Sequence, residues 1–159
     1  VDDAPTVVRY PKGAVTEPLP AVSTSGDIDV LATFGDGAPR VVVFGIGSMA
    51  STAIDVAGKL AAQGQTVIAA TATWVHPVPD GLLEVIGDAE LVVTVEDGLT
   101  DAGVGEAWAE FARLAGRYAV WSHHGVPREF LHNASRAQIL DEIGLEASAI
   151  ADAALARLT

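Results

Sequence analysis

The sequence contains no cysteine among its 159 residues. It therefore offers neither a disulfide framework nor a thiolate nucleophile. Basic residues are also few, because nine Lys and Arg stand against 21 Asp and Glu and give a formal net charge of −12. A chain this acidic repels phosphate backbones and anionic membrane surfaces. We therefore expect neither nucleic acid nor a membrane as a partner.

Long apolar runs are missing as well. No run approaches the roughly 20 residues that span a bilayer. The sequence does not open on a basic stretch followed by an apolar one, which is the pattern of a secretory leader. These features predict a cytoplasmic location. The first residue is Val1 instead of methionine, in a stretch typical of the interior of a protein, which favours a piece of a longer polypeptide.

The composition predicts one domain with an appendage. Hydrophobic residues make up 50% of the chain, enough for one real core but not for two large domains. Residues 17–26 are rich in Pro, Ser, Thr and Gly, as linkers are. Ahead of them, residues 6–10 predict a short strand that a turn at 11–13 ends. We therefore divide the chain into residues 1–26, the end of a preceding domain plus a linker, and residues 27–159, the main domain.

The main domain is organised around residues 40–70, which predict a strand, a helix and a second strand. Residues 41–44 form an unbroken run of β-branched and aromatic side chains, typical of a strand buried on both faces of a parallel sheet. A glycine turn follows, and Ser48 is expected to cap a helix over residues 49–63. Gly64 is expected to end that helix. The result is a βαβ unit, which is almost always right-handed.

The remaining elements extend this unit into a layered fold. Alternating residues over 28–34 predict a strand that pairs antiparallel with residues 41–44 at the sheet edge. A buried strand is predicted at 91–95 and a last strand at 118–122. Helical spacing is found after Asp80, after Gly105, over 135–143 and at the C-terminus. The pattern predicts an α/β fold of three layers, αβα, with a mostly parallel sheet of about five strands and one antiparallel edge strand.

Two of the predicted helices carry specific expectations. In the helix after Gly105, four residues share one face and are expected in the core: Trp108, Phe111, Ala112 and Ala115. In the next helix, Ser135 and Gln138 have the spacing of a capping box.

Two glycine turns at predicted strand-to-helix junctions could bear on ligand binding. Residues 45–48 could bind a phosphate through helix N–H groups, yet they lack the lysine of a Walker motif and the third glycine of a dinucleotide fingerprint. Residues 103–105 are equally open to a simpler interpretation, since close packing of a helix on a strand also requires glycine. We prefer the packing interpretation for both turns.

Histidines and acidic residues offer the other candidates. His123, His124 and His132 lack a carboxylate or cysteine at ligand spacing, and vicinal histidines on a strand point to opposite faces. Glu96 and Asp97 follow a buried strand, where open α/β sheets keep their ligand crevices. They could act as an acid/base pair, although a solvated turn or a helix partner is the more ordinary role. We predict no catalytic, cofactor or metal-binding residue from these patterns.

Taken together, several short stretches resemble the C-terminus of thiamine-diphosphate enzymes of the transketolase superfamily in order and spacing. Within that superfamily they are most similar to the 1-deoxy-D-xylulose-5-phosphate synthase family, in particular through the Arg-Tyr-Pro-Lys-Gly strand and the closing Gly-Leu. The stretches are Val8–Gly13, Val42–Met49, Val75–Asp80, Val93–Gly98, Gly103–Gly105, Gly125–Pro127 and Ile143–Leu145.

The resemblance implies a parent enzyme that condenses pyruvate with glyceraldehyde 3-phosphate and releases carbon dioxide, in the supply of isoprenoid, thiamine and pyridoxal precursors. It implies thiamine diphosphate and magnesium as cofactors, held by preceding domains of the same polypeptide, and a homodimer. This chain would be the third domain, inactive alone. By resemblance, Arg9 matches the arginine that contacts the substrate phosphate, and no other residue here matches a catalytic or cofactor-binding role.

Two alternatives stay open. The chain could be the equivalent domain of a transketolase or of a 2-oxoacid dehydrogenase β subunit, in which an acyltransferase partner replaces the second small substrate. It could also be a free-standing regulatory module that binds a small ligand at the glycine turns near Ser48 and Gly103.

Overall fold

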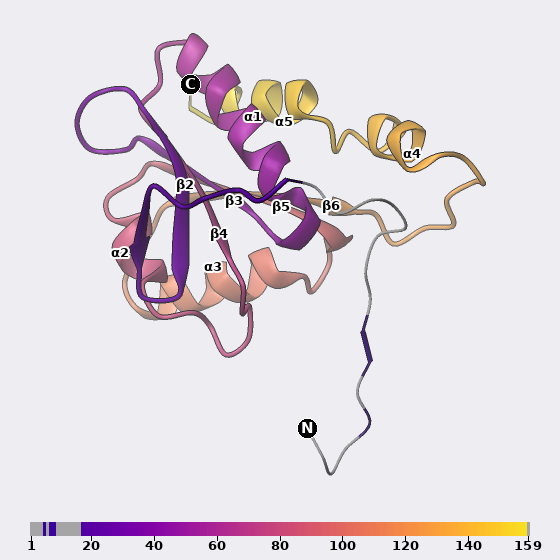
Figure 1. Ribbon diagram of the computed structural model, residues 1–159, viewed down its shortest axis with the longest axis horizontal. Helices are drawn as coiled ribbons and strands as arrows, with labels where there is room; N and C mark the ends of the chain where they lie inside the picture. The colour runs from indigo at the N-terminus through magenta and orange to yellow at the C-terminus, as the bar shows by residue number, and fades with distance from the viewer. Residues whose placement is uncertain (1–4, 6, 9–16, 159) are drawn as a thin grey trace.

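The computed structural model describes residues 5, 7–8 and 17–158. Three strands come first in this part of the chain, helices and strands then alternate up to the sixth strand, and two helices follow (Figure 1). The strands are β1 (Ser23–Ser25), β2 (Ile28–Phe34), β3 (Val41–Gly45), β4 (Val67–Ala72), β5 (Leu91–Leu99) and β6 (Val120–Val126). The helices are a 3₁₀ turn η1 (Gly47–Met49), α1 (Ala50–Ala62), α2 (Leu82–Ile86), α3 (Val104–Leu114), α4 (Arg136–Glu142) and α5 (Ala147–Leu155).

The six strands form one sheet in the order β1-β2-β4-β3-β5-β6. Strands β3, β4, β5 and β6 run parallel, whereas β2 runs antiparallel to both β4 and β1. The predicted α/β class, with a mostly parallel sheet and an antiparallel strand toward one edge, is confirmed. No helix in the described part of the chain is long and apolar enough to cross a membrane.

Two details of the predicted pairing are wrong. Strand β2 pairs with β4, with Phe34 opposite Val67, and does not pair with β3, its neighbour in sequence. The turn after β2 therefore does not make a hairpin; the chain passes over β4 before it enters the sheet at β3. In addition, Ser23–Ser25, expected in the linker, form the outermost strand on that side. Polar side chains suffice there because both Ser23 and Thr24 are exposed at the sheet edge.

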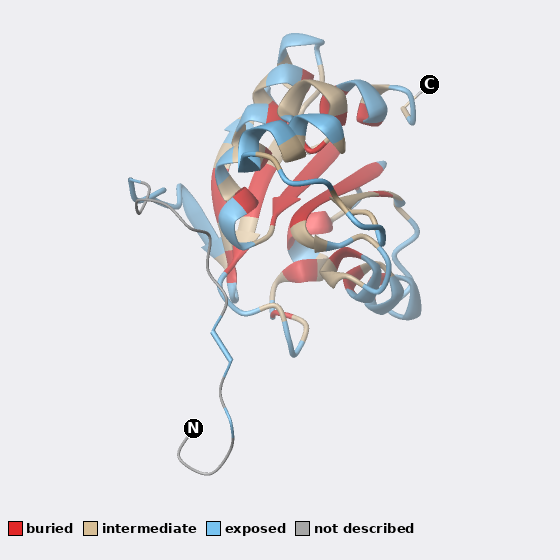
Figure 2. Ribbon diagram, turned by 90° about the vertical axis from the view of Figure 1, so that its right-hand side faces the viewer, coloured by how far each residue is buried: buried red, intermediate tan, exposed pale blue. Residues whose placement is uncertain are grey.

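Helices cover both faces of the sheet and create two separate cores. Figure 1 shows α1 and α5 on one face and α2 and α3 on the other. Successive residues of β3 alternate between them, since Val41 and Val43 belong to the α1/α5 core and Val42 and Phe44 to the α2/α3 core. Figure 2 shows the buried strands enclosed between exposed helical surfaces. The continuous apolar pattern of β3 arises because both of its faces are covered.

Helix α1 begins differently from the expectation. Ser48 lies inside the 3₁₀ turn, and the residue before the helix, Met49, makes no capping hydrogen bond through its side chain. The Ser48 hydroxyl instead donates to Asp97 Oδ2 at 2.8 Å. The helix ends as predicted, because Gly64 adopts a positive φ of 82° and its N–H donates to the carbonyl of Ala61.

Helix α3 buries a narrower face than its spacing indicates. Trp108 and Ala112 are fully buried as predicted, and the Trp108 ring meets the edge of Phe44 with centroids 5.3 Å apart. Phe111, expected beside them, is 41% exposed, and Ala115 is exposed past the helix end. Gly105 lies on the face of α3 that packs directly against β5 and β6, where a side chain would not fit.

The last two helices follow the predicted local signals. Ser135 Oγ accepts from the Gln138 N–H and Gln138 Oε1 accepts from the Ser135 N–H, so the capping box is present. Helix α5 buries Ile150, Ala151 and Ala154 against α1 and the sheet. At α2, however, Gly81 is the N-cap in place of the predicted Asp80.

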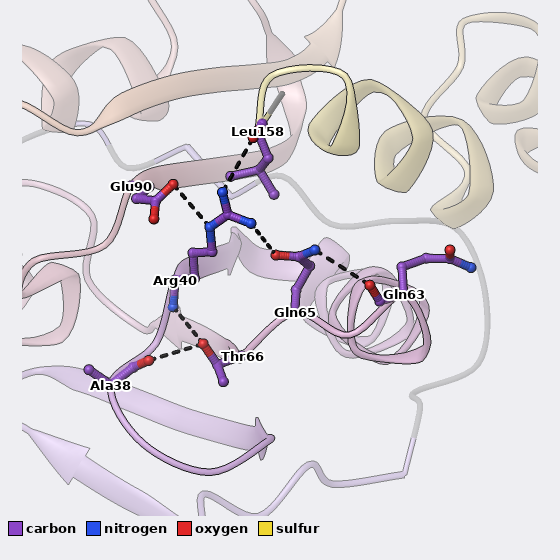
Figure 3. Close-up of polar contacts among 7 residues, drawn as sticks. All are labelled: Ala38, Arg40, Gln63, Gln65, Thr66, Glu90 and Leu158. Atoms are coloured by element: carbon purple, nitrogen blue, oxygen red, sulfur yellow. Dashed lines mark hydrogen bonds and ion pairs between the residues drawn. The ribbon is translucent and has the colours of Figure 1, made fainter.

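Arg40 joins the C-terminal segment to the amino end of the sheet (Figure 3). Its guanidinium contacts Glu90 Oε2 at 3.0 Å, Gln65 Oε1 at 2.9 Å and the Leu158 carbonyl at 3.3 Å. Its backbone N–H donates to Thr66 Oγ1 at 3.0 Å. The hydrogen bond from Arg40 lowers the pKa of Glu90. One side chain thus connects the starts of β3, β4 and β5 with the residues that follow α5.

Truncation of the buried indole of α3 tests this packing. We expect Trp108→Ala to lower the free energy of unfolding by about 3 to 5 kcal/mol, because it leaves a cavity between α3 and β3. Phe111→Ala, three residues away on the exposed flank, is the matched control and should cost less than about 1 kcal/mol. Urea titration of both variants measures the difference, and equal losses would contradict the described burial.

Candidate functional site at the carboxyl edge of the sheet

The candidate site lies between the carboxyl ends of β3 and β5. The connection after β3 leads to β4 on one side, and the connection after β5 leads to β6 on the other. Open α/β sheets leave a crevice at such a reversal of strand order. The segments that border it here are the turn after Gly45 and the stretch from Glu96 to Val104.

Three polar side chains from distant parts of the chain meet at this crevice. Ser48 follows β3, Asp97 lies near the end of β5, and Arg136 is the first residue of α4. Arg136 Nη2 lies 3.2 Å from Asp97 Oδ2 and 3.1 Å from Ser48 Oγ, and it also contacts Met49 Sδ at 3.6 Å. The phosphate-binding interpretation of the first glycine turn gains no support, since a carboxylate and a guanidinium already engage its serine. The group holds α4 across the crevice.

Glu96 has a different environment from its neighbour Asp97. Its side chain is only 5% exposed and accepts hydrogen bonds from the N–H groups of Val104 and Gly105, each at 3.1 Å. These are the first two residues of α3, where unpaired N–H groups and the helix dipole favour a negative charge. The helix-partner interpretation therefore holds for Glu96. An acid/base pair does not form, because the two carboxylates bind different elements.

The second glycine turn serves close packing, as preferred. A Cβ on Gly103 would collide with Glu96 Oε1 and the Leu99 carbonyl. One on Gly105 would collide with Thr94 Oγ1 and lie 2.6 Å from His123 Nδ1. Both glycines let α3 approach β5 closely enough for the Glu96 carboxylate to reach the helix N–H groups.

The histidines do not gather into a metal site. His123 Nδ1 lies 2.8 Å from Thr94 Oγ1, and His124 Nε2 lies 3.0 Å from Ser122 Oγ. Burial lowers the pKa of His123, and burial together with Arg157 lowers the pKa of His124 to about 4. His132 pairs with Glu142 across α4 at 3.2 Å. Among the described residues, no group of three or more His, Asp or Glu could hold a metal ion.

The polar contacts described at this edge do not include the site residue predicted from the sequence. Arg9, the predicted phosphate contact, lies outside the described residues, as does the expected strand around it except for Val7 and Val8. Arg136, conversely, was not singled out from the sequence. Its only local signal was its position just after the capping serine, which gives no indication of a contact 39 residues upstream at Asp97.

The order of strands and helices defines an open α/β domain with a mostly parallel sheet. The family described as "Transketolase, C-terminal domain" matches residues 34–150. The chain belongs to this family.

Two curated relatives of the chain carry the same enzyme name. The chain is 44% identical to 1-deoxy-D-xylulose-5-phosphate synthase 1 of Kitasatospora griseola, over 95% of this chain and 23% of the relative. It is 42% identical to 1-deoxy-D-xylulose-5-phosphate synthase of Kocuria rhizophila, over 98% of this chain and 24% of the relative. The chain therefore spans about a quarter of the length of the curated relatives it matches.

Solved structures share the fold at lower identity. A split-gene transketolase, described as an inactive β4 tetramer, superposes with a TM-score of 0.65 at 24% identity, covering 86% of this chain and 43% of the other. A transketolase from Pichia stipitis superposes with a TM-score of 0.58 at 17% identity, covering 83% of this chain and 18% of the other. These likenesses show the fold alone.

The two neighbouring carboxylates allow a matched test of the site. We expect Glu96→Ala to lower the free energy of unfolding by about 1.5 to 3 kcal/mol, because it leaves two helix N–H groups without their charged acceptor. Asp97→Ala removes a partly exposed ion pair and should cost about 1 kcal/mol or less. Chemical denaturation of the two variants provides the comparison. A larger loss of stability for Asp97→Ala would mean that the contact of Asp97 with α4 stabilises this edge more than the contact of Glu96 with α3 does.

Proposed function

We propose that the chain is the C-terminal, non-catalytic domain of a 1-deoxy-D-xylulose-5-phosphate synthase. The observation that carries the proposal is the 42 to 46% identity to enzymes of that name over at least 95% of this chain, at about a quarter of their length. The parent enzyme condenses pyruvate with glyceraldehyde 3-phosphate and releases carbon dioxide. It acts in the cytoplasm as a homodimer, and the domain contacts the preceding domains of its own polypeptide.

The residues described here do not fit the cofactors of that reaction. Thiamine diphosphate with its magnesium ion needs oxygen ligands for the metal and a site for the diphosphate. The described residues contain no metal-binding cluster, and Ser48 at the glycine turn is bound to Asp97 and Arg136. In this proposal the preceding domains hold the cofactor, and no step of the reaction is assigned to this sheet.

The domain's own contribution is structural in this proposal. At its carboxyl edge, Ser48, Asp97 and Arg136 contact one another and connect α4 to the sheet. The segment ahead of β1 connects the domain to the catalytic part, and Arg9 lies on this segment. Arg9 would bind the phosphate of the aldehyde substrate, since a guanidinium can donate two parallel hydrogen bonds to phosphate oxygens.

A domain exchange tests the assignment. The segment of the Kitasatospora griseola enzyme that matches this chain is replaced by residues 1–159, and carbon dioxide release from pyruvate is measured with glyceraldehyde 3-phosphate. We expect a rate within about tenfold of the intact enzyme, or about 1.4 kcal/mol in the barrier. The same exchange with the Pichia stipitis transketolase domain is the control, and it should give a much slower enzyme.

Two results of the exchange would favour other functions. A folded but inactive synthase chimera, beside an active Pichia stipitis transketolase whose matching segment is replaced by residues 1–159, would indicate the equivalent domain of a transketolase. Binding of this chain to the carrier or acyltransferase component of a 2-oxoacid dehydrogenase in a pulldown would indicate a β-subunit domain. A free-standing regulatory module would instead show a thermal shift with a nucleotide or metabolite in the absence of other domains.

Substrate kinetics test Arg9. In the active chimera, Arg9→Ala should lower kcat/KM for glyceraldehyde 3-phosphate by roughly 10- to 150-fold, which corresponds to the loss of a charged hydrogen bond worth about 1.5 to 3 kcal/mol. The constants for pyruvate and for non-phosphorylated glyceraldehyde should change little. Lys12→Ala is the matched control on the same segment. Equal losses of kcat/KM with both aldehydes would contradict phosphate binding. They would favour the alternative that Arg9 forms a surface ion pair with an acidic neighbour such as Asp2 or Asp3.

A further inference from the structure

A pocket of about 420 Å³ lies between helix α3, the segment that follows it, and strand β6. One stripe of the helix forms a wall, in which Glu106, Glu110 and Arg113 follow one another at spacings of four and three residues. Small side chains at Ala109 and Ala119 leave room between the helix and the strand. The volume falls within the range of about 300 to 1,000 Å³ that is typical of small-molecule sites.

Trp121 gives the pocket a rigid aromatic wall. Its side chain is partly buried against the α2/α3 core, and its ring stacks on the His123 ring with centroids 5.8 Å apart and planes inclined by 29°. Both rings also line the pocket. An indole that is already immobilised loses little conformational entropy when a flat molecule stacks on it. The wall therefore suits an aromatic ligand.

His123 offers one hydrogen-bond donor to this space. Its Nδ1 lies 2.8 Å from the hydroxyl of Thr94, which is fully buried. A buried hydroxyl needs an acceptor, so Thr94 donates to Nδ1 and the neutral imidazole carries its proton on Nε2. Burial lowers the pKa of His123, which keeps the ring mainly neutral at pH 7. In the described part of the chain Nε2 has no partner, yet no buried side-chain nitrogen there is unpaired. Nε2 is therefore accessible, and it can donate to a ligand in the pocket that His123 lines.

The charged side chains around the pocket favour an anion beside Arg117. Both carboxylates of the helical wall are engaged, because Glu110 accepts two hydrogen bonds from Arg113, each at 2.7 Å, and Glu106 accepts one from a backbone N–H at 2.8 Å. Arg117 pairs with Asp88 at 3.3 Å, and that carboxylate side chain is 99% exposed. Such exposed pairs contribute little. An anionic group in the pocket can therefore replace Asp88 as the partner of Arg117.

The end of α3 does not oppose an anion at this position. The carbonyls of Phe111, Ala112 and Arg113 accept hydrogen bonds from the N–H groups of residues 115, 117 and 116. Negative partial charge at a helix end resides on carbonyls without such partners. The bonds formed by residues 115–117 therefore reduce the negative charge that α3 directs toward Arg117.

We propose that this pocket binds a flat aromatic carboxylate of one or two fused rings, with the rings stacked on Trp121 and the carboxylate paired with Arg117. A polar ring substituent away from the carboxylate accepts from His123 Nε2–H. The formal net charge of −12 disfavours anions at long range, so a local guanidinium is required for such binding. The inference does not depend on the proposed function, since all of these groups belong to the described part of this chain.

Titration of the 159-residue chain with 2-naphthoate tests the site. The chain has three tryptophans, and the indole N–H of each gives its own NMR signal. We expect the Trp121 signal to shift with a Kd of about 1 mM or lower, whereas the signals of Trp74 and Trp108 stay in place. The uncharged 2-naphthalenemethanol should bind about tenfold more weakly, because it lacks a charged partner for Arg117. The cationic 2-naphthylmethylamine should bind more weakly still.

Two variants with matched controls assign the contacts. Arg117→Gln should weaken 2-naphthoate binding by about tenfold or more and leave binding of the alcohol unchanged. Arg128→Gln, at another exposed ion pair, should change neither affinity. Trp121→Leu keeps an apolar side chain against the core but removes the stacking surface, so it should weaken both ligands by about tenfold. Trp74→Ala, at an exposed tryptophan outside the pocket, should weaken neither.

A hydroxylated ligand tests the donor of His123. 6-Hydroxy-2-naphthoate carries an acceptor oxygen far from its carboxylate and should bind about threefold more tightly than 2-naphthoate. His123→Phe keeps a ring beside Trp121 and should remove this difference. Equal affinities for the acid and the alcohol, tighter binding of the amine, or a shift of the Trp74 signal in place of Trp121 would overturn the proposal. So would the absence of any shift at about ten times the expected Kd.

Discussion

Burial of the two central strands on both faces is the constraint on which the rest of this structure depends. Val41–Phe44 and Leu91–Val93 have no exposed surface, so each strand needs helices above and below it. A parallel pair cannot be joined by a tight turn, which makes α1 and α3 necessary as connections. The two cores follow from the alternation of side chains along these strands. The outer strands β4 and β6 then pair with the free sides of β3 and β5.

Close approach of α3 to the sheet determines the chemistry of the carboxyl edge. Because Gly103 and Gly105 carry no side chains, the helix start reaches the Glu96 carboxylate, which satisfies the N–H groups of Val104 and Gly105. The buried Glu96 carboxylate thereby has hydrogen-bond partners and anchors the start of α3.

Arg136 and Arg40 secure the two ends of the sheet in comparable ways. Each guanidinium binds groups from several elements, Arg136 at the carboxyl edge and Arg40 at the amino edge. Helix α4 has no fully buried residue; Leu140 packs partly buried against the α1/α5 core, and Arg136 adds polar contacts to Ser48 and Asp97.

The sequence alone determined what depends on local pattern. The apolar run of β3, the capping box at Ser135, the helix end at Gly64 and the burial of Trp108 all follow from spacing within a few residues, and the structure confirms them. Only the tertiary structure decided which strands became neighbours. Strand β2 pairs with β4, and three serine and threonine residues of an expected linker form β1. Pairing depends on which edge remains open after the helices have packed, and no short stretch encodes this. The same reason separates Glu96 from Asp97: adjacent in sequence and identical in charge, they differ because one faces the start of α3 and the other faces Ser48 and Arg136.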